Sequence, residues 1–135
     1  MAGYSGTPLW KKLGYETGMF VYVDGGPKNY HSLLDIPTDL RVNWLAQRRS
    51  DMNLVHLFTT SASELKSRLK SYRHKIVPDG TIWVSWPKKS SGVKTDITED
   101  TIRDIALPIG LVDIKVCAVD EVWSGLKLVI RKERR

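Results

Sequence analysis

Cysteine is almost absent from this chain of 135 residues, which contains only Cys117. A single cysteine cannot form an internal disulfide, so we expect a protein that folds in a reducing compartment. Long apolar runs are missing too, because none approaches the roughly 20 residues that a membrane-spanning helix needs. The chain also does not open with a basic segment followed by an apolar one. The sequence predicts a soluble, cytoplasmic protein.

Histidine is scarce, and the motifs of common catalytic sites are missing. The three histidines, His31, His56 and His74, lie far apart, and with one cysteine they show no metal-ligand spacing. No nucleophile elbow, P-loop or zincin motif occurs. We therefore predict no metal site and no catalytic residue. Enzymatic activity stays an open question, but the sequence favours a protein without it.

Apolar residues are abundant enough for a core: 41% of the chain is hydrophobic and 27% is charged. This composition predicts one globular domain over residues 1–135, with a glycine-punctuated, irregular segment at 1–18. Lysine and arginine number 21 against 15 acidic residues, which gives a basic protein of formal charge +6. Such an excess favours acidic partners. Much of it lies in a basic tail at 131–135, which a solvated end would also explain.

Apolar periodicity and turn residues predict an alternation of strands and helices. The expected helices cover 8–13, 29–34, 61 to about 77, and 96 or 98 to 107; the expected strands cover 19–23, 40–45, 54–58, 81–86, 111–119 and 126–132. The link between the last two strands is too short for a crossover helix, so they should form an antiparallel hairpin. The order predicts an α/β fold: a Rossmann-like, mostly parallel sheet of about five to six strands, ending in a C-terminal antiparallel β-hairpin.

The carboxyl ends of parallel strands meet at one edge of such a sheet, and ligands bind there. Polar residues, glycines and one tryptophan follow three of the expected strands: Asp24, Gly25, Gly26 and Asn29; Thr60 and Ser61; Trp86, Lys88 and Lys89. Helix-start amides and lysines attract negative charge, and Trp86 offers a stacking face. These residues predict a site for a small anionic or nucleotide-like ligand. Ordinary turn and cap chemistry, with Trp86 in the core, is the alternative.

Two further features concern larger partners. The basic loop 88–94, together with Arg48, Arg49 and the tail, is a candidate surface for nucleic-acid phosphates. A solvated surface loop is the favoured alternative, because no recognised nucleic-acid motif accompanies it. Trp123 falls in the expected hairpin loop. Because an exposed tryptophan in a loop is typical of interfaces, it is a candidate contact for a protein partner. Nothing in the sequence suggests a membrane partner.

Part of the chain resembles class I S-adenosylmethionine-dependent methyltransferases. Residues 51–58 resemble the fourth strand of these enzymes, 65–77 the helix after it, and Pro78-Asp79-Gly80-Thr81-Ile82-Trp83-Val84 the "pGG" turn and fifth strand. The closing hairpin also matches. The resemblance implies S-adenosylmethionine beside an acid and spaced glycines after the first strand, with a second acid on the ribose.

The cofactor-binding pattern of that family is incomplete here. Only Asp24-Gly25-Gly26 follows the first strand before Pro27, and Ala46-Gln47-Arg48-Arg49 stands where the ribose-binding acid is expected. The stretch from Gly26 to Leu54 is too short for all the elements of the usual fold, so the chain resembles a truncated methyltransferase. S-adenosylmethionine is a disfavoured cofactor, and we expect no other.

Nearly the whole chain also resembles an uncharacterised bacterial family known only as a domain of unknown function. Three stretches carry this resemblance: 4–9, 83–88, and 110–132 with its Val119-Asp120-Glu121-Val122-Trp123-Ser124-Gly125. The resemblance implies no activity. The leading hypothesis is a non-catalytic, methyltransferase-like binding or regulatory module for a small anionic ligand or a protein partner. The alternatives are a nucleic-acid-binding protein and a divergent S-adenosylmethionine-dependent methyltransferase.

Overall fold

A computed structural model describes residues 6–135, so predictions that fall on residues 1–5, including Tyr4 and Ser5, lie outside it. The helices are α1 (Leu9–Leu13), α2 (Tyr30–Leu34), α3 (Ala62–Arg73) and α4 (Glu99–Ala106), with short 3-10 turns η1 (Lys89–Ser91), η2 (Leu107–Ile109) and η3 (Lys132–Arg134). The strands are β1 (Phe20–Asp24), β2 (Asn43–Trp44), β3 (Met52–Phe58), β4 (Ile76–Pro87), β5 (Leu111–Ala118) and β6 (Trp123–Ile130). Within residues 6–135, no helix has the length and apolar character that crossing a membrane requires.

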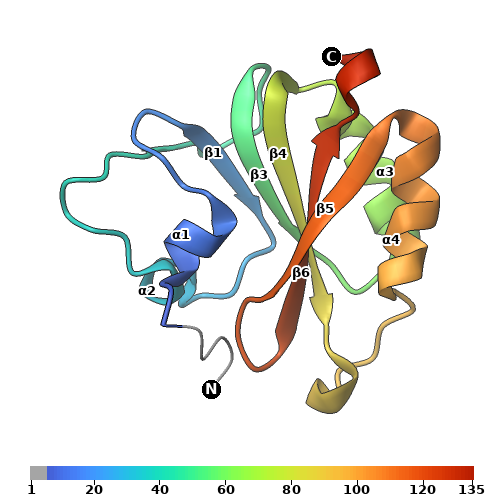
Figure 1. Cartoon of the computed structure of the whole chain (residues 1–135). Helices are drawn as coiled ribbons and strands as arrows, with labels where there is room; N and C mark the ends of the chain where they lie inside the picture. The colour runs from blue at the N-terminus through green and yellow to red at the C-terminus, as the bar shows by residue number, and fades with distance from the viewer. Residues whose placement is uncertain (1–5) are drawn as a thin grey trace.

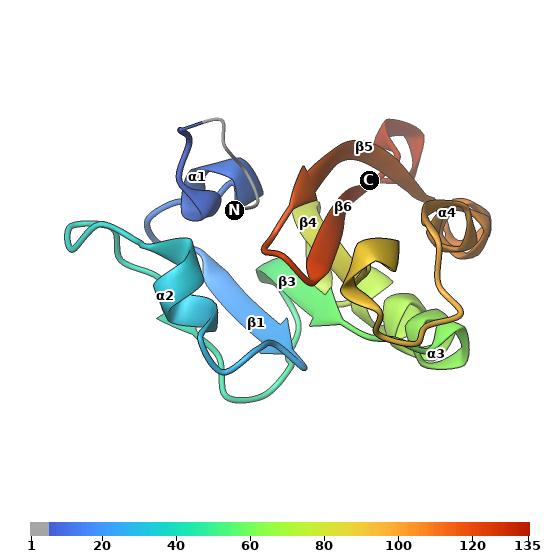
Figure 2. The ribbon, with the colours of Figure 1, turned by 90° about the horizontal axis from the view of Figure 1, so that it is seen from below.

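The strands form one sheet in the order β2-β1-β3-β4-β6-β5. The pairs β1–β2, β1–β3 and β3–β4 are parallel, whereas β6 runs antiparallel to both β4 and β5. Helices α1 and α2 lie on one side of the sheet and α3 and α4 on the other (Figures 1 and 2). The predicted Rossmann-like sheet with its closing antiparallel hairpin is confirmed.

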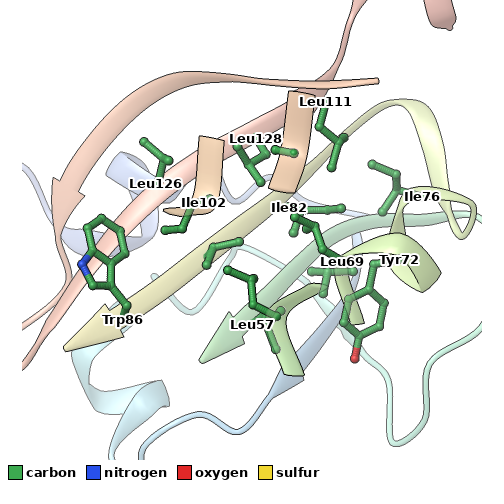
Figure 3. Close-up of a cluster of buried hydrophobic side chains, with 14 of the residues drawn as sticks. Leu57, Leu69, Tyr72, Ile76, Ile82, Trp86, Ile102, Leu111, Leu126 and Leu128 are labelled. Carbon is green, nitrogen blue, oxygen red and sulfur yellow. The ribbon is translucent and has the colours of Figure 1, made fainter. Parts of the chain in front are cut away.

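Two apolar clusters hold these layers together. One lies between the sheet and α3 and α4, and Figure 3 shows side chains from both layers meeting there. The other packs α1 and α2 against the opposite face. Successive side chains of β4 point to opposite faces of the sheet, so this strand contributes to both clusters: Ile82 and Val84 belong to the first and Trp83 to the second. The Trp83 indole N–H also donates to the Leu13 carbonyl at 2.9 Å, which fastens α1 to the sheet.

The structure corrects the predicted ends of three elements. Helix α3 ends at Arg73 rather than near residue 77, because the Lys75 carbonyl already accepts from the Met52 amide and sheet pairing begins. The predicted turn at 78–80 lies inside β4, where the pairing with β3 shifts in register. The strand predicted over 40–45 pairs with β1 only at Asn43–Trp44.

Candidate ligand site at the carboxyl edge of the sheet

Strands β1, β3 and β4 end side by side. Asp24 pairs with Leu57, and Phe58 pairs with Ser85, so the three carboxyl ends lie along one edge. The segments that begin with Gly25, Thr59 and Lys88 therefore leave the sheet at a common rim, as the sequence predicts. The rim is confirmed, but it does not form a single site.

A cavity of about 870 Å³ lies at the ends of β3 and β4. Five of the predicted ligand residues line it: Thr60, Ser61, Trp86, Lys88 and Lys89. The rest of its wall comes from the segment that links η1 to α4, including Val93, Lys94, Asp96 and Ile97. The sequence predicts Val93 and Lys94 only as part of the basic loop 88–94, and it assigns Ile97 to no site. Their place in the cavity depends on how that link folds back over the sheet.

The start of α3 is already occupied by the protein's own side chains. The Ser61 hydroxyl accepts from the Glu64 amide, and the Asp96 carboxylate accepts from the Ala62 amide at 2.8 Å. Ser61 and Glu64 have the spacing of a capping box, but the Glu64 side chain does not reach back to the Ser61 amide and accepts from the Thr59 hydroxyl instead. An anionic ligand would therefore have to compete with the Asp96 carboxylate for these amides.

The lysines of the cavity differ in their surroundings. The Lys88 ammonium donates to the Asp120 carbonyl at 2.6 Å and so ties the rim to the β5–β6 hairpin. The side chains of Lys89 and Lys94 are exposed and form no hydrogen bond or ion pair with any residue of 6–135. The acidic residues of the wall are engaged elsewhere, Asp96 on α3 and Glu99 with Arg103. Lys89 and Lys94 therefore line the cavity without an ion-pair partner among residues 6–135, in a wall with three lysines and two carboxylates.

Apolar side chains form the rest of the wall. Trp86 is only 8% exposed and packs in the core beside α3 and α4, so most of its ring is unavailable for stacking (Figure 3). The alternative of a core tryptophan is correct, although part of Trp86 still lines the cavity. Val93, 44% exposed, and the buried Ile97 add aliphatic surface. The cavity combines an apolar wall with positive charge.

The residues after β1 do not contribute to this cavity. Gly25 has a left-handed φ of 72°, and a Cβ there would lie 2.9 Å from the Phe58 carbonyl oxygen. A Cβ on Gly26 would lie 2.7 Å from the Val23 side chain. These two glycines let the turn pack directly onto the end of β3. Asn29 lines a different cavity of about 960 Å³ between α1, α2 and the β5–β6 hairpin.

Asp24 is held by α3. One carboxylate oxygen accepts from the Arg68 guanidinium at 2.9 Å and the other from the Tyr72 hydroxyl. Burial, together with this hydrogen bond, raises the pKa of Tyr72 well above its usual value. The Arg48 guanidinium lies 5.6 Å from the centre of the Tyr72 ring, beyond the end of β2. Asp24, the acid expected to bind S-adenosylmethionine, is already bonded to Arg68 and Tyr72. After β2, Arg48 stands in the segment where the ribose-binding acid is expected. The described residues therefore do not fit that cofactor at its expected place.

A buried chain of hydrogen bonds crosses the core. The Tyr15 and Tyr30 hydroxyls lie 2.7 Å apart, Tyr30 bonds His56 Nδ1 at 2.7 Å, and His56 Nε2 bonds the Ser85 hydroxyl at 2.7 Å. Burial lowers the pKa of His56 to about 3, so the imidazole is neutral. His56 is therefore a hydrogen-bonded residue of the core. Its partners were missed because they lie 26 and 29 positions away in the sequence.

Two predictions about larger partners need correction in their geometry. Trp123 does not lie exposed in a hairpin loop: it opens β6, is half-buried, and packs edge-on against Phe58 at 5.1 Å. Among the tryptophans, it is Trp44, on the edge strand β2, that is most exposed, at 40%. The basic loop 88–94 and the tail 131–135 do not share a surface, because antiparallel pairing of β4 and β6 puts them at opposite ends of the sheet (Figure 1).

No family model matches the chain, and no curated protein matches it. Solved structures do. A S-adenosylmethionine-dependent methyltransferase from Aquifex aeolicus has a TM-score of 0.60 and 16% identity, with 89% of this chain and 86% of that one covered. Magnesium protoporphyrin IX methyltransferase from Synechocystis has a TM-score of 0.60 and 10% identity, with 92% and 74% covered. An O-methyltransferase from neocarzinostatin biosynthesis has a TM-score of 0.65 and 13% identity, with 94% and 53% covered.

These similarities concern the fold, because the identities are too low to transfer an activity. They agree with the sheet order, the closing antiparallel hairpin and the helices on both faces described above. The chain has a Rossmann-like α/β fold of the class I S-adenosylmethionine-dependent methyltransferase type.

Proposed function

We propose that this chain is a binding domain on a methyltransferase-like fold, and that the cavity at the ends of β3 and β4 takes a small nucleotide-like ligand. The observation that carries the proposal is the pair of exposed ammonium groups of Lys89 and Lys94, which form no ion pair among residues 6–135 and lie beside an apolar wall. Ligand sites typically combine a mostly apolar lining with a few placed polar groups, in a volume of roughly 300–1,000 Å³. The volume of about 870 Å³ lies within that range.

The chemistry of the wall indicates how such a ligand would lie. Val93 and Ile97, with the accessible part of Trp86, would cover a planar ring system. Lys89 and Lys94 would meet its phosphate. Recognition of the anion then depends on ammonium groups rather than on the amides of α3, which Ser61 and Asp96 already occupy.

A thermal-shift screen followed by calorimetry tests this proposal. Nucleoside mono-, di- and triphosphates and sugar phosphates are screened at millimolar concentration, where a ligand at 100 times its dissociation constant adds about 2.7 kcal/mol of stability. Lys89→Gln/Lys94→Gln should weaken the best ligand at least about tenfold, the effect of losing roughly 1.4 kcal/mol of binding energy. Lys11→Gln/Lys66→Gln, which changes one exposed lysine of α1 and one of α3, is the matched control. The proposal is wrong if no phosphate ester binds, or if both double variants bind it equally.

A second candidate is a divergent S-adenosylmethionine-dependent methyltransferase, which the fold similarity favours. Cofactor binding in the usual place would require the Asp24 carboxylate to leave Arg68 and Tyr72. The same screen includes S-adenosylmethionine and its demethylated product. A shift with both compounds that survives Lys89→Gln/Lys94→Gln would favour this candidate over the first. The absence of a shift at millimolar concentration would remove it.

A further inference from the structure

Basic residues from two distant segments meet at the amino edge of the sheet, opposite the ligand cavity. In the antiparallel pair β4–β6, Thr81 pairs with Val129 and Pro87 with Trp123. The residues after Ile130 therefore lie beside the amino end of β4, far from Lys88, as Figure 1 shows for the C-terminus and the segment after β4. Helix α3 runs back from the carboxyl edge, so its last turn reaches this same amino edge.

Gly110 marks the point where the two segments meet. A Cβ built on Gly110 would lie 3.3 Å from Nη1 of Arg134 and 3.4 Å from Nη2 of Arg73. Two guanidinium groups from positions 61 residues apart in the chain therefore flank one glycine. With Arg131 and Arg135 from the same tail, they form what we term the arginine cluster: Arg73, Arg131, Arg134 and Arg135.

Backbone carbonyls fix two of these side chains. Arg73 Nε donates to the Ile109 carbonyl at 3.0 Å, and Arg135 Nε donates to the Ile130 carbonyl at 2.7 Å. The Nε of each of these two guanidiniums therefore donates within the molecule, whereas their Nη groups form no hydrogen bond with any residue of 6–135. Arg131 Nε is buried without a hydrogen-bond partner and lies 3.7 Å from Glu133, the acidic residue of the tail.

Charge in this cluster is not balanced as it is elsewhere in the molecule. Arg68 pairs with Asp24 and Glu64, and Arg103 pairs with Glu99, Asp100 and Asp113. Among residues 6–135, by contrast, no carboxylate forms an ion pair with Arg73, Arg134 or Arg135. The guanidiniums of Arg73 and Arg134 beside Gly110, with Arg135 next in the same tail, carry like charges that repel each other, so an external anion there lowers the energy of the assembly.

We infer that the arginine cluster binds the phosphates of a nucleic-acid backbone. Guanidinium groups present paired N–H donors that match phosphate oxygens, which single-point ammonium groups do not. Lys70 and Lys75 lie in the same segment as Arg73, and Lys132 lies in the same segment as Arg134, so each of the two segments carries a row of basic residues. A repeating backbone phosphate satisfies such a row better than a single small anion does. This surface is separate from the ligand cavity, and the inference does not depend on the function proposed for that cavity.

Fluorescence anisotropy with a labelled 20-nucleotide single strand and a 20-base-pair duplex tests the inference. For duplex DNA, each phosphate contact contributes about 0.9 to the slope of log affinity against log salt. Three contacts should therefore lower the affinity about 40-fold between 50 and 200 mM salt. Arg73→Gln/Arg134→Gln should weaken binding at least about tenfold and reduce that slope by about two. Arg73→Lys/Arg134→Lys keeps the charge and should weaken binding less.

Two further variants make the result interpretable. Arg73→Gln/Arg134→Gln removes the Arg73 hydrogen bond to the Ile109 carbonyl and could unfold the chain for that reason. Lys132→Gln/Arg134→Gln avoids this problem, because both side chains are exposed and form no hydrogen bond among the described residues. Lys89→Gln/Lys94→Gln removes the same net charge at the opposite edge and should bind within about twofold of the parent chain. The inference is overturned if neither probe binds at 50 mM salt, if the Lys89 and Arg134 variants weaken binding equally, or if inorganic phosphate binds while both probes do not.

Discussion

Replacing Asp24 by asparagine tests whether this acid holds the fold together or serves a ligand. In the structure its carboxylate accepts from both Arg68 and Tyr72, so it joins the end of β1 to α3. The Asp24 side chain is 15% exposed and that of Arg68 is 34% exposed, which places the pair partly out of solvent. Asparagine has nearly the same volume, but it has one acceptor oxygen, and its amide would face the other donor.

The expected cost follows from these contacts. Hydrogen bonds to a charged group are worth about 1.5–3 kcal/mol when buried. The contribution of Arg68 is discounted because its side chain is a third exposed. We therefore expect Asp24→Asn to lower the free energy of unfolding by about 2 kcal/mol. For a chain of this size that corresponds to a fall of roughly 6–10 °C in Tm.

Thermal unfolding followed by circular dichroism measures the effect, with Asp39→Asn as the control because Asp39 is exposed and forms no hydrogen bond among the described residues. Tyr72→Phe in the Asp24→Asn background should cost less than Tyr72→Phe alone, because the two side chains share one interaction. If Asp24→Asn leaves Tm unchanged but abolishes binding of S-adenosylmethionine, the carboxylate is a ligand-binding group and the structural argument fails.

Two more predictions concern the core and the rim. The pKa of His56 is about 3 in the folded chain, below the ordinary 6.5, so its contribution to stability is complete above pH 6.5 and is lost as the pH falls toward 3. Urea unfolding should show a loss of about 2 kcal/mol between pH 7 and pH 5 that is absent in His56→Gln; an equal loss in both chains would contradict this. Gly25→Ala should destabilise more than Gly92→Ala, because both glycines have positive φ but only at Gly25 would the new Cβ lie within 3 Å of a backbone atom, the Phe58 carbonyl oxygen. Equal Tm losses would show that the contact with Phe58 does not matter.

The sequence predicts the order of strands and helices because the local patterns are strong. The run that includes Leu54 and Phe58 is apolar on both faces, and Ser61 does cap the helix that follows. It predicts element ends less well where two local signals compete. Pro78-Asp79-Gly80 is typical of a turn, yet the backbone there belongs to β4, because pairing with β3 begins as early as Ile76. Tertiary pairing outweighs the local turn preference at that point.

The candidate site is predictable only in part, because its details depend on contacts between distant residues. The common rim follows from topology alone. The topology does not predict that the Asp96 carboxylate accepts from the Ala62 amide at the start of α3, since Asp96 lies 34 positions after Ala62. The position of the turn at Gly25 and Gly26 is likewise set by its close approach to Phe58, which lies far along the chain. The arginine cluster depends on the antiparallel pairing of β6, which carries the tail away from the basic loop with which sequence reasoning grouped it.

The chain of hydroxyls and imidazole through Tyr15, Tyr30, His56 and Ser85 has a consequence for how the molecule opens. It links the segment after α1 to α2, β3 and β4 through directional contacts rather than through apolar surface alone. Since every member is buried, detaching any one leaves its neighbour with an unmet donor or acceptor in a dry interior. Amide hydrogens of α2 and of the middle of β3 should therefore exchange with solvent in a single concerted event, at one common protection factor, although α2 is only five residues long.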